Sequence, residues 1–409
     1  MEDAKAEVCI VGAGAAGLWA AAACGRQGLD TLVLEKTPRC GSKVLASGGG
    51  RCNLTTTLDA AETARHFGRA HNFIAPALRC LSPQAVRAHF ESIGVATKVE
   101  PELQKVFPVS DSALEVRDAL ERDARAAGAR FRLESAVSAV EPFEGGWVAR
   151  TAQGPVSCRR LLLCVGGKSF PKTGTTGDGY RWLRALGLRV VDPVPALVPL
   201  ASPAPWIHEL SGTSVDGELR IGKLRRRRPV LFTHQGISGP GAMDVSEAVS
   251  RGGQREARLD LLPDLSWLEL RSLLIAAAGR AGSPRLASVL PLPRRVVAMV
   301  ALRAELAEAN PRANQLDKSS RHKLIDELKG LRIPISGTLG FAKAEVTAGG
   351  LALKEVNPGT MEVRRAPGLY VFGELLDLAG PIGGFNFQAA FSTAELAARA
   401  VGLAAQRAR

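Results

Sequence analysis

Hydrophobic positions near the start of the chain follow two different periods, and this change predicts the first elements. Residues 8–11 form a short apolar run rich in β-branched side chains, and a second apolar run covers residues 31–34. Between them lie a glycine-rich turn and an alanine-rich segment with helical spacing. A strand, a tight turn, a helix and a second strand in this order predict the first unit of a parallel α/β sheet.

The same pattern predicts the remaining elements. Further strands are expected at residues 130–133, 147–151, 161–165, 219–221, 230–233, 258–261, 341–347, 361–364 and 369–372. Further helices are expected at residues 82–93, 111–127, 179–186, 266–278, 293–309, 319–329 and from Asn386 onward. Ser82, Ser110 and Asp178 are expected to cap the first three of these helices.

A proline-rich stretch divides the chain into domains. Prolines stand at positions 193, 195, 199, 203 and 205, a composition typical of a crossing between domains. We therefore expect an α/β dinucleotide-binding domain made of residues 1–191 and 336–409. An insert domain of residues 192–335 would combine a small β-barrel with a helical part. The last helix has an aliphatic face interrupted by polar residues, which predicts a core helix and not a membrane span.

The first glycine-rich turn carries a dinucleotide-binding fingerprint. Gly12 would make the turn, Gly14 would let the backbone approach a pyrophosphate, and Gly17 would let the helix pack on the strand. The helix N-terminus offers unpaired N–H groups to phosphates. Glu35 ends the second strand, near the position expected for a carboxylate that binds a ribose diol. The motif predicts a dinucleotide without distinguishing FAD from NAD; a glycine-rich turn of another α/β protein is the alternative.

Three later glycine-rich stretches have similar chemistry. The glycines at 48–50 suit a loop whose N–H groups lie against an anion or a flat ring, and a flexible linker is the alternative. The glycine pair at 166–167 follows a buried strand, and ligands of open α/β sheets bind at the carboxyl ends of strands. Residues 373–385 have the composition of a second cradle in front of the last helix.

Composition narrows the class of protein. The chain has 409 residues, 46% of them hydrophobic and 23% charged, as in ordinary globular proteins. Its seven cysteines show no C-x-x-C spacing, which argues against a disulfide framework, a zinc site and a redox dithiol. Because the sequence shows neither a signal peptide nor an uncharged run of about 18 residues, we expect a cytoplasmic protein with no membrane partner.

The net charge of +13 raises the question of an anionic partner. The densest basic cluster, Lys223 and Arg225 to Arg228, could be a nucleic-acid patch or a solvated turn between two strands. No aromatic residues alternate with these arginines, as stacking on bases would require. We therefore expect the turn, and no nucleic-acid partner.

Six motifs in order resemble the flavoprotein family that contains the aminoacetone oxidase-like and bile-acid reductase-like proteins, within the glutathione-reductase-type FAD superfamily. They are VGAGAAG, SGGGRCNLT, GGKSFPKTGTTGDGY, FTHQGISGPG, KAEVTAGGL and GELLDLAGPIGGFNFQAAFSTA. The resemblance implies FAD as the tightly held dinucleotide. It also implies a Rossmann-type domain built from the two chain ends, with the insert domain closing over the flavin.

The resemblance also implies a set of cofactor-binding residues. The pyrophosphate and the adenosine ribose would be bound by Gly12, Gly14, Gly17 and Glu35. The pyrophosphate and the flavin would be lined by Lys43, Ser47, Gly48, Gly49, Gly50, Arg51 and Asn53. The ribityl region would be bound by Gly373, Glu374 and Asp377. Ala15, Ala16, Lys36, Gly166 and Gly167 complete this part of the set. Gly383, Gly384, Phe385 and Asn386 would present helix-terminal N–H groups to the flavin N1/O2 edge, where reduction places negative charge.

The flavin would carry the redox chemistry, so the expected function is an FAD-dependent oxidoreductase of a small organic metabolite. His234 and Ser238, together with Gln235, lie in a glycine-rich loop of the insert domain and are the candidates for catalysis or substrate contact. Hydride would be transferred at flavin N5, with NAD(P)H or O2 as redox partner. No second G-x-G-x-x-G follows a strand, so NAD(P)H would visit transiently. An RNA-associated flavoprotein and a non-catalytic flavin-binding sensor are the alternatives, and a homodimer is left open.

Overall fold

Residues 4–101 and 104–407 are described by a computed structural model, and they form two compact units. Unit 1 comprises Met1–Val194 and Glu345–Arg409, and unit 2 comprises Pro195–Ala344. Unit 2 begins at residue 195, three residues later than the expected 192, and ends at residue 344, nine residues later than the expected 335. The reason is that the proline-rich stretch begins as an extended strand, β10 (Val190–Ala196), which pairs with β18 (Val346–Leu351).

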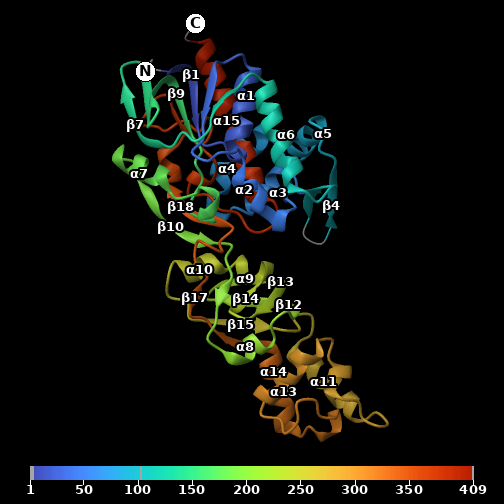
Figure 1. Ribbon diagram of the computed structural model, residues 1–409. Helices are drawn as coiled ribbons and strands as arrows, with labels where there is room; N and C mark the ends of the chain where they lie inside the picture. The colour runs from blue at the N-terminus through green and yellow to red at the C-terminus, as the bar shows by residue number, and fades with distance from the viewer. Residues whose placement is uncertain (1–3, 102–103, 408–409) are drawn as a thin grey trace. The chain divides into compact units, whose positions relative to one another are not determined.

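Unit 1 is organised around a seven-stranded sheet, labelled in part in Figure 1. Its parallel strands lie in the order β6 (Arg130–Arg132), β2 (Thr31–Leu34), β1 (Ala4–Val11), β9 (Gly154–Leu163) and β19 (Leu369–Val371). The hairpin of β7 (Val137–Phe143) and β8 (Gly146–Thr151) pairs antiparallel with the first half of β9. The carboxyl ends of β1, β9 and β19 therefore meet at one edge of the sheet.

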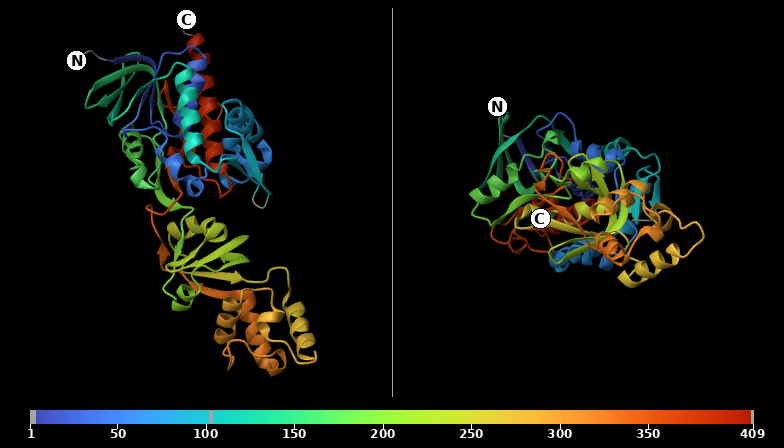
Figure 2. Two further views of the ribbon diagram at one scale, coloured as in Figure 1. Left: turned by 45° about the vertical axis from the view of Figure 1, so that its right-hand side comes forward. Right: turned by 90° about the horizontal axis from the view of Figure 1, so that it is seen from below.

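Among the described residues of unit 1, three helices are the longest, and the first of them packs against both of the others. They are α1 (Ala15–Arg26), α6 (Ala113–Ala126) and α15 (Phe385–Gln406), and they run side by side in Figures 1 and 2. Trp19 Nε1 on α1 donates to Glu395 Oε2 on α15 at 2.9 Å. The apolar face of α15 is buried in the core of unit 1, so the expected core helix is confirmed.

The shorter helices of unit 1 are α2 (Ser42–Ala46), α3 (Ala60–Arg65), α4 (His71–Cys80), α5 (Pro83–Ser92) and α7 (Asp178–Ala185). A small separate sheet contains the strands β3 (Thr55–Thr56), β5 (Lys105–Pro108) and β4 (Thr97–Glu100), in this order. Ser82 caps α5 as expected, accepting from Ala85 N at 3.2 Å. The other two caps were wrong. The N-cap of α6 is Ser112, because Asp111 takes a positive φ of 53°, and the N-cap of α7 is Gly177.

Unit 2 combines a seven-stranded antiparallel sheet with helices. The strands lie in the order β16 (Leu331–Pro334), β15 (Glu256–Asp260), β12 (Ser214–Ile221), β13 (Leu224–Thr233), β14 (Gly236–Ser238), β11 (Leu200–Ala201) and β17 (Gly337–Thr338). The helices are α8 (Pro205–Glu209), α9 (Gly239–Met243), α10 (Ser246–Ser250), α11 (Trp267–Ala278), α12 (Leu286–Val289), α13 (Arg294–Arg303) and α14 (Lys318–Gly330). Their apolar faces share one hydrophobic core.

The basic run lies in a strand, and our expectation of a solvated turn was wrong. Ile221 pairs with Leu224, so Gly222 and Lys223 alone make the turn between β12 and β13. Gly222 supplies the positive φ of 56° that a two-residue hairpin turn needs. Arg225 to Arg228 therefore alternate between the two faces of β13.

Among the described residues, no helix is both long and apolar enough to cross a membrane.

Candidate functional site

The turn after β1 has the close packing that its glycines predict. Gly12 has a φ of +105°, and a Cβ there would lie 2.9 Å from the carbonyl oxygen of Cys164, at the end of β9. A Cβ on Gly17 would lie 1.9 Å from the carbonyl oxygen of Gly12. These two glycines thus hold the start of α1 directly against the sheet.

Gly14 differs from its two neighbours because it faces open space. It is the N-cap of α1, with an ordinary extended backbone, and a Cβ there would meet no atom within 4 Å. Gly14 and Ala15 are partly exposed, whereas Ala16 and Gly17 are buried. The first N–H groups of α1 have no acceptor within the helix. This turn therefore presents donors beside a space that a phosphate can fill.

Glu35 and Lys36 tie this turn to neighbouring loops. Glu35 Oε2 accepts from Ala13 N at 2.8 Å, and Glu35 Oε1 accepts from Thr37 N at the same distance. Lys36 Nζ pairs with Asp178 Oδ2 at 2.7 Å. Burial acts to raise the pKa of Asp178, but hydrogen bonds from Lys36 and Thr176 outweigh it and lower that pKa. Glu35 thus lies at the glycine turn, and its binding of a ribose stays a prediction. Lys36 is held by Thr176 and by Asp178 at the start of α7.

Lys43 lies at the centre of a polar cluster that joins four segments. Its ammonium group contacts Glu374 Oε2 at 2.5 Å and Ser169 Oγ at 2.6 Å. Glu374 Oε1 accepts from Ser169 Oγ and from Thr347 N, both at 2.8 Å. Thr347 Oγ1 in turn accepts from Lys168 N at 2.8 Å. The cluster links α2, the loop after β9, strand β18 and the segment after β19.

The glycines at 48–50 form an exposed turn with positive φ at all three positions. A Cβ on Gly49 or Gly50 would meet no atom within 4 Å, and Ser47 Oγ bonds back to Val44 O at 2.6 Å. Arg51 pairs with Glu100 on β4 and with Asp111 before α6, and its guanidinium carbon lies 4.2 Å from the centre of the Phe107 ring on β5.

Asn53 connects this turn to the start of α15. With its amide oriented to satisfy both ends, Asn53 Oδ1 accepts from Gly384 N at 2.8 Å and Nδ2 donates to Thr55 O at 2.9 Å. A Cβ on Gly384 would lie 2.3 Å from Thr55 O, so only glycine fits there. The SGGGRCN and GGFN motifs, far apart in the sequence, are thus in direct contact.

The loop before α15 is folded on itself. Asn386 Oδ1 accepts from Gly380 N at 2.9 Å and Nδ2 donates to Gly380 O at 3.0 Å, so this side chain braces the loop. Phe385 is buried and stacks on His66, with 4.6 Å between ring centres. The N–H groups of the first turn of α15 have no acceptor within the helix. The positive end of the helix dipole lies at the same point.

The remaining expected residues lie around the same edge. A Cβ on Gly373 would lie 3.1 Å from Ala16 Cβ, which brings the GELLD segment against the start of α1. Asp377 Oδ1 accepts from Gly349 N at 3.1 Å. Gly166 takes a positive φ, and a Cβ on Gly167 would lie 2.3 Å from Thr347 Oγ1. Five motifs of unit 1 therefore come together beyond the carboxyl ends of β1, β9 and β19.

Sequence reasoning gave no role to Ser169, Thr347 or Tyr180, although each lies in one of the quoted motifs. Ser169 and Thr347 are buried and bond to the Lys43–Glu374 pair or its neighbours. The hydroxyl of Tyr180 is buried and has no hydrogen-bond partner within the described chain. Burial, followed by the carboxylates of Glu374 and Asp377, raises its pKa. Their place in the motifs was the only available signal.

The two catalytic candidates lie in unit 2. His234 is exposed in the turn between β13 and β14, where Thr233 Oγ1 bonds to Gly236 O at 3.1 Å. Ser238 is the N-cap of α9 but makes no capping hydrogen bond, and it is partly exposed. His234 therefore lies in the turn before β14 and Ser238 at the end of that strand, and their role in catalysis stays a prediction.

The seven cysteines are unpaired, and six of them are buried. Burial raises the pKa of Cys24, Cys40 and Cys52 to about 12, so these groups are protonated thiols at neutral pH. Burial also raises the pKa of Cys80, but this thiol is only partly buried, so we expect DTNB at a pH of about 8 to modify Cys80 faster than the other six in the native protein. Rapid release of two or more equivalents would contradict the burial described. Unfolding in guanidinium should release all seven.

The edge of unit 1 fits the requirements of an extended dinucleotide. It offers an open glycine position at Gly14, an open turn at 48–50 and two helix N-termini whose first N–H groups have no acceptor within the helix. Glu35 lies at the end where an adenosine ribose is expected, and the Lys43–Glu374 pair lies further along the edge. Among the described residues, no group of three or more metal-ligating side chains gathers.

Comparison with known proteins gives this geometry a family. Residues 6–400 match the model of the HI0933-like protein Rossmann domain. The chain is 32% identical to the ribosomal RNA dihydrouridine synthase of Escherichia coli over 95% of this chain and 96% of that protein. It is 30% identical to the 3-dehydro-bile acid delta(4,6)-reductase of Clostridium scindens over 96% and 98%.

Solved structures show the same fold at low identity. An open flavocytochrome c3 fumarate reductase matches with a TM-score of 0.53 and 16% identity, over 98% of this chain and 78% of that chain. The 3-ketosteroid-delta4-(5alpha)-dehydrogenase of Rhodococcus jostii RHA1 matches with a TM-score of 0.51 and 18% identity, over 98% of both chains. Unit 1 is a Rossmann-type FAD-binding domain, and the chain belongs to the HI0933-like Rossmann-domain family.

Proposed function

We propose that this protein is an FAD-dependent reductase that saturates the C5=C6 bond of uracil in structured RNA. The observation that carries the proposal is similarity over nearly the whole length to two proteins named ribosomal RNA dihydrouridine synthase. One is the E. coli protein above, and the other, from Haemophilus influenzae, is 30% identical over 95% of this chain. Because both units are covered, the resemblance includes the insert as well as the flavin domain.

The chemistry of the second named relative supports the reaction type. A bile-acid delta(4,6)-reductase acts on carbon–carbon double bonds, and the prefix 3-dehydro denotes a carbonyl group at position 3. Uracil likewise has a C5=C6 bond conjugated to the C4 carbonyl. Both names therefore describe addition of hydride and a proton across an activated double bond.

When bound, FAD would supply hydride transfer at N5, with NAD(P)H as the source of the hydride, C6 of uracil as its acceptor and a proton added at C5. The chain's own residues would bind and orient the cofactor. The first turn of α1 would hold the pyrophosphate, and Glu35 the ribose. The first turn of α15 would place N–H donors at the N1/O2 edge. His234 and Ser238 stay our candidates for substrate contact and proton delivery.

The proposal is tested by supplying the FAD-loaded protein with NADPH, or separately NADH, and an in vitro transcribed ribosomal RNA. Nucleoside mass spectrometry should show dihydrouridine that depends on both the protein and the reductant. No dihydrouridine with either reductant would contradict the proposal. His234→Gln and Ser238→Ala are expected to lower the rate while leaving the flavin spectrum unchanged.

A second function is favoured by the bile-acid reductase itself, which matches 96% of this chain. In this alternative the substrate is a small conjugated ketone, and a 3-keto-4,6-diene steroid is its probe. Consumption of NAD(P)H with the steroid but not with RNA would favour it. Peroxide formation from aminoacetone in air, without NAD(P)H, would instead indicate an oxidase.

A further inference from the structure

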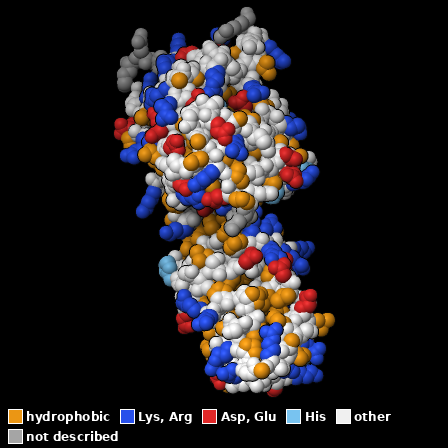
Figure 3. Space-filling view, turned by 90° about the vertical axis from the view of Figure 1, so that its right-hand side faces the viewer, with side chains coloured by type: hydrophobic (Ala, Val, Ile, Leu, Met, Phe, Trp, Pro, Cys, Tyr) orange, Lys and Arg blue, Asp and Glu red, His pale blue; other side chains and the backbone are white. Residues whose placement is uncertain are grey.

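Unit 2 contains fewer than half of the residues of the chain but carries more than half of its net positive charge. Its 150 residues include 22 lysines and arginines against 14 acidic residues, a difference of +8 out of +13 for the chain. On the face drawn in Figure 3, basic and acidic side chains are interspersed. A site for an anionic partner must therefore be found from the arrangement of particular arginines.

The pairing of the sheet brings four arginines into one row. Arg225 on β13 is directly opposite Arg220 on β12, and Arg220 is directly opposite Arg258 on β15. Arg258 is in turn opposite Arg332 on β16. All four are exposed, while their strand neighbours Leu219, Ile221, Ala257, Leu259, Leu331 and Ile333 are buried on the other face.

Such a row disfavours folding, although Glu218 and Glu256 offset part of the repulsion. Like charges directly opposite each other on neighbouring strands destabilise a sheet, and this row contains three such pairs. Neighbouring strands lie about 4.8 Å apart, so the row spans about 14 Å. A helical nucleic-acid strand carries about four phosphates over that length, since its charges are spaced about 3.4 Å apart.

Nearby acidic residues orient the arginines. Glu218 Oε1 accepts from Arg220 Nε at 2.6 Å, and Glu256 Oε1 accepts from Arg258 Nε at 3.1 Å. Because each contact uses Nε, the terminal amino groups stay available for a bidentate phosphate contact. Arg227 shares this face but is held by Asp264 and Asp216, so it does not belong to the row.

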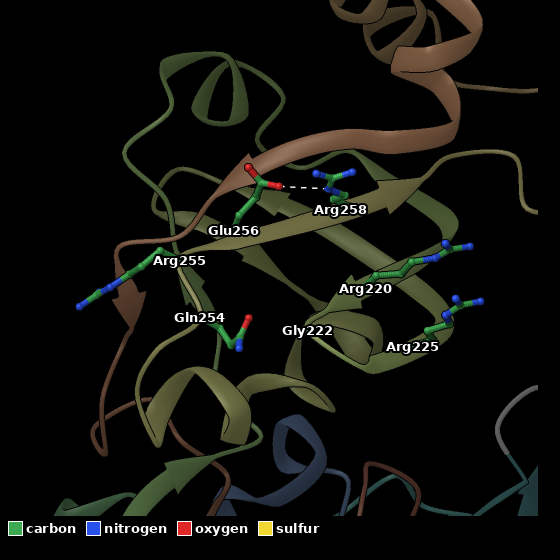
Figure 4. A pocket seen from close by; sticks show the side chains of 7 residues that line it. All are labelled: Arg220, Gly222, Arg225, Gln254, Arg255, Glu256 and Arg258. Atoms are coloured by element: carbon green, nitrogen blue, oxygen red, sulfur yellow. Dashed lines mark hydrogen bonds and ion pairs between the residues drawn. The ribbon is translucent and has the colours of Figure 1, made fainter.

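The row borders a hollow of about 500 Å³ lined by Arg220, Gly222, Arg225, Gln254, Arg255, Glu256 and Arg258. Figure 4 shows Arg220 and Arg225 extending next to each other from the β12–β13 hairpin, with the Glu256–Arg258 pair on the adjacent strand. The hollow lies wholly within unit 2.

We propose that the row of Arg220, Arg225, Arg258 and Arg332 binds the phosphate backbone of the RNA substrate. The choice of RNA rests on the proposed function and on the positive charge of the row. The lining of the hollow also includes Gln254, whose amide group can donate to and accept from a base or a ribose. Contacts of this kind position an RNA without reading its sequence.

The test compares two variants of equal charge in the full-length protein. The row variant is R220Q/R225Q/R258Q/R332Q. The control is R271Q/R280Q/R294Q/K318Q, which removes four exposed cations of the helical part of unit 2. Binding of a labelled ribosomal RNA fragment is measured by fluorescence anisotropy over a range of salt concentrations, without NAD(P)H.

We expect the row variant to bind RNA on the order of 100-fold more weakly at about 0.1 M salt, with a salt slope smaller by about three. The control should change the affinity less than about fivefold. The melting temperature of the row variant should equal or exceed that of the wild type, because like-charge pairs are removed. Equal weakening by both variants would overturn the proposal, as would binding of the wild type to anionic phosphatidylserine vesicles but not to RNA.

The two proposals fail in different ways. If the row variant forms dihydrouridine as fast as the wild type at limiting RNA concentration, the proposal that the row binds RNA is contradicted, whereas the proposed function is not. Row-dependent RNA binding with no dihydrouridine under any reductant would remove the function and leave an RNA-binding flavoprotein.

Discussion

Replacing Gly14 by alanine is expected to raise the Kd for FAD by at least about tenfold while the apoprotein stays folded. The protein itself has room for the new methyl group, since a Cβ at this position meets no atom within 4 Å. The space it enters is the one assigned to the pyrophosphate, whose contact with the backbone is the reason for glycine here. A tenfold change corresponds to about 1.4 kcal/mol, a modest cost for one displaced phosphate contact.

The measurement is a titration of apoprotein with FAD followed by flavin fluorescence, together with the melting temperature without FAD. Alanine is a poorer N-cap than glycine, so a loss of about 1 kcal/mol, or about 2–4 °C, is expected. An unchanged FAD affinity would contradict the placement of the pyrophosphate at this turn.

Replacing Gly17 by alanine is expected to act mainly on folding and less on cofactor binding, with a large loss of stability even without FAD. Its Cβ would lie 1.9 Å from the carbonyl oxygen of Gly12 and 3.0 Å from Cys164 Sγ, so α1 must move away from the sheet. Overpacking of a buried contact costs about 1–3 kcal/mol or more, and here backbone must shift. We expect the melting temperature of unit 1 to fall by about 5 °C or more, and the purified protein to contain little flavin.

Gly330→Ala is the matched control for this substitution. Gly330 ends α14 in unit 2, and a Cβ there meets no atom within 4 Å. Alanine in a helix is favoured over glycine by about 0.5–1 kcal/mol, so the control should be neutral or slightly stabilising. If Gly17→Ala melted like the control and retained FAD, the close approach of α1 to β1 would be wrong.

Much of unit 1 could be predicted because its signals are local. The apolar runs at residues 8–11 and 31–34 lie within β1 and on β2, and the turn between β1 and α1 has the packing its glycines predict. Elements controlled by distant contacts were harder. A strand expected at 361–364 is reduced to isolated bridges, since Met361 takes a positive φ of 60°.

The polar cluster of the candidate site shows a second limit. Lys43 could be singled out by its motif, but its partner Glu374 is 331 positions away, and no periodicity connects them. The contact between Asn53 and Gly384 likewise joins residues far apart in the sequence, and no local pattern predicts it. Which polar groups face each other is decided by the order of strands in the sheet, and a single sequence does not encode that order in its local pattern.

The basic run shows a third limit, because composition and register are separate properties. Residues 223–228 were interpreted by their charge and the absence of aromatic residues, both of which describe neighbours in sequence. The row of four arginines takes only Arg225 from that run and three members from other strands. A cross-strand arrangement becomes visible only when the register is known.

The division of unit 1 between the two ends of the chain has a consequence for its biosynthesis. Unit 2 is continuous, so all its residues are synthesised before β19 and α15 are made. Domains fold as units during synthesis, at about 5–20 residues per second. The insert can therefore adopt its structure on the nascent chain, whereas the edge around Gly14 lacks Glu374 and the first turn of α15 until translation is nearly complete. A nascent chain that ends before residue 369 would therefore contain every residue of the insert but lack β19, Glu374 and the first turn of α15, so the edge proposed to hold the cofactor is completed last.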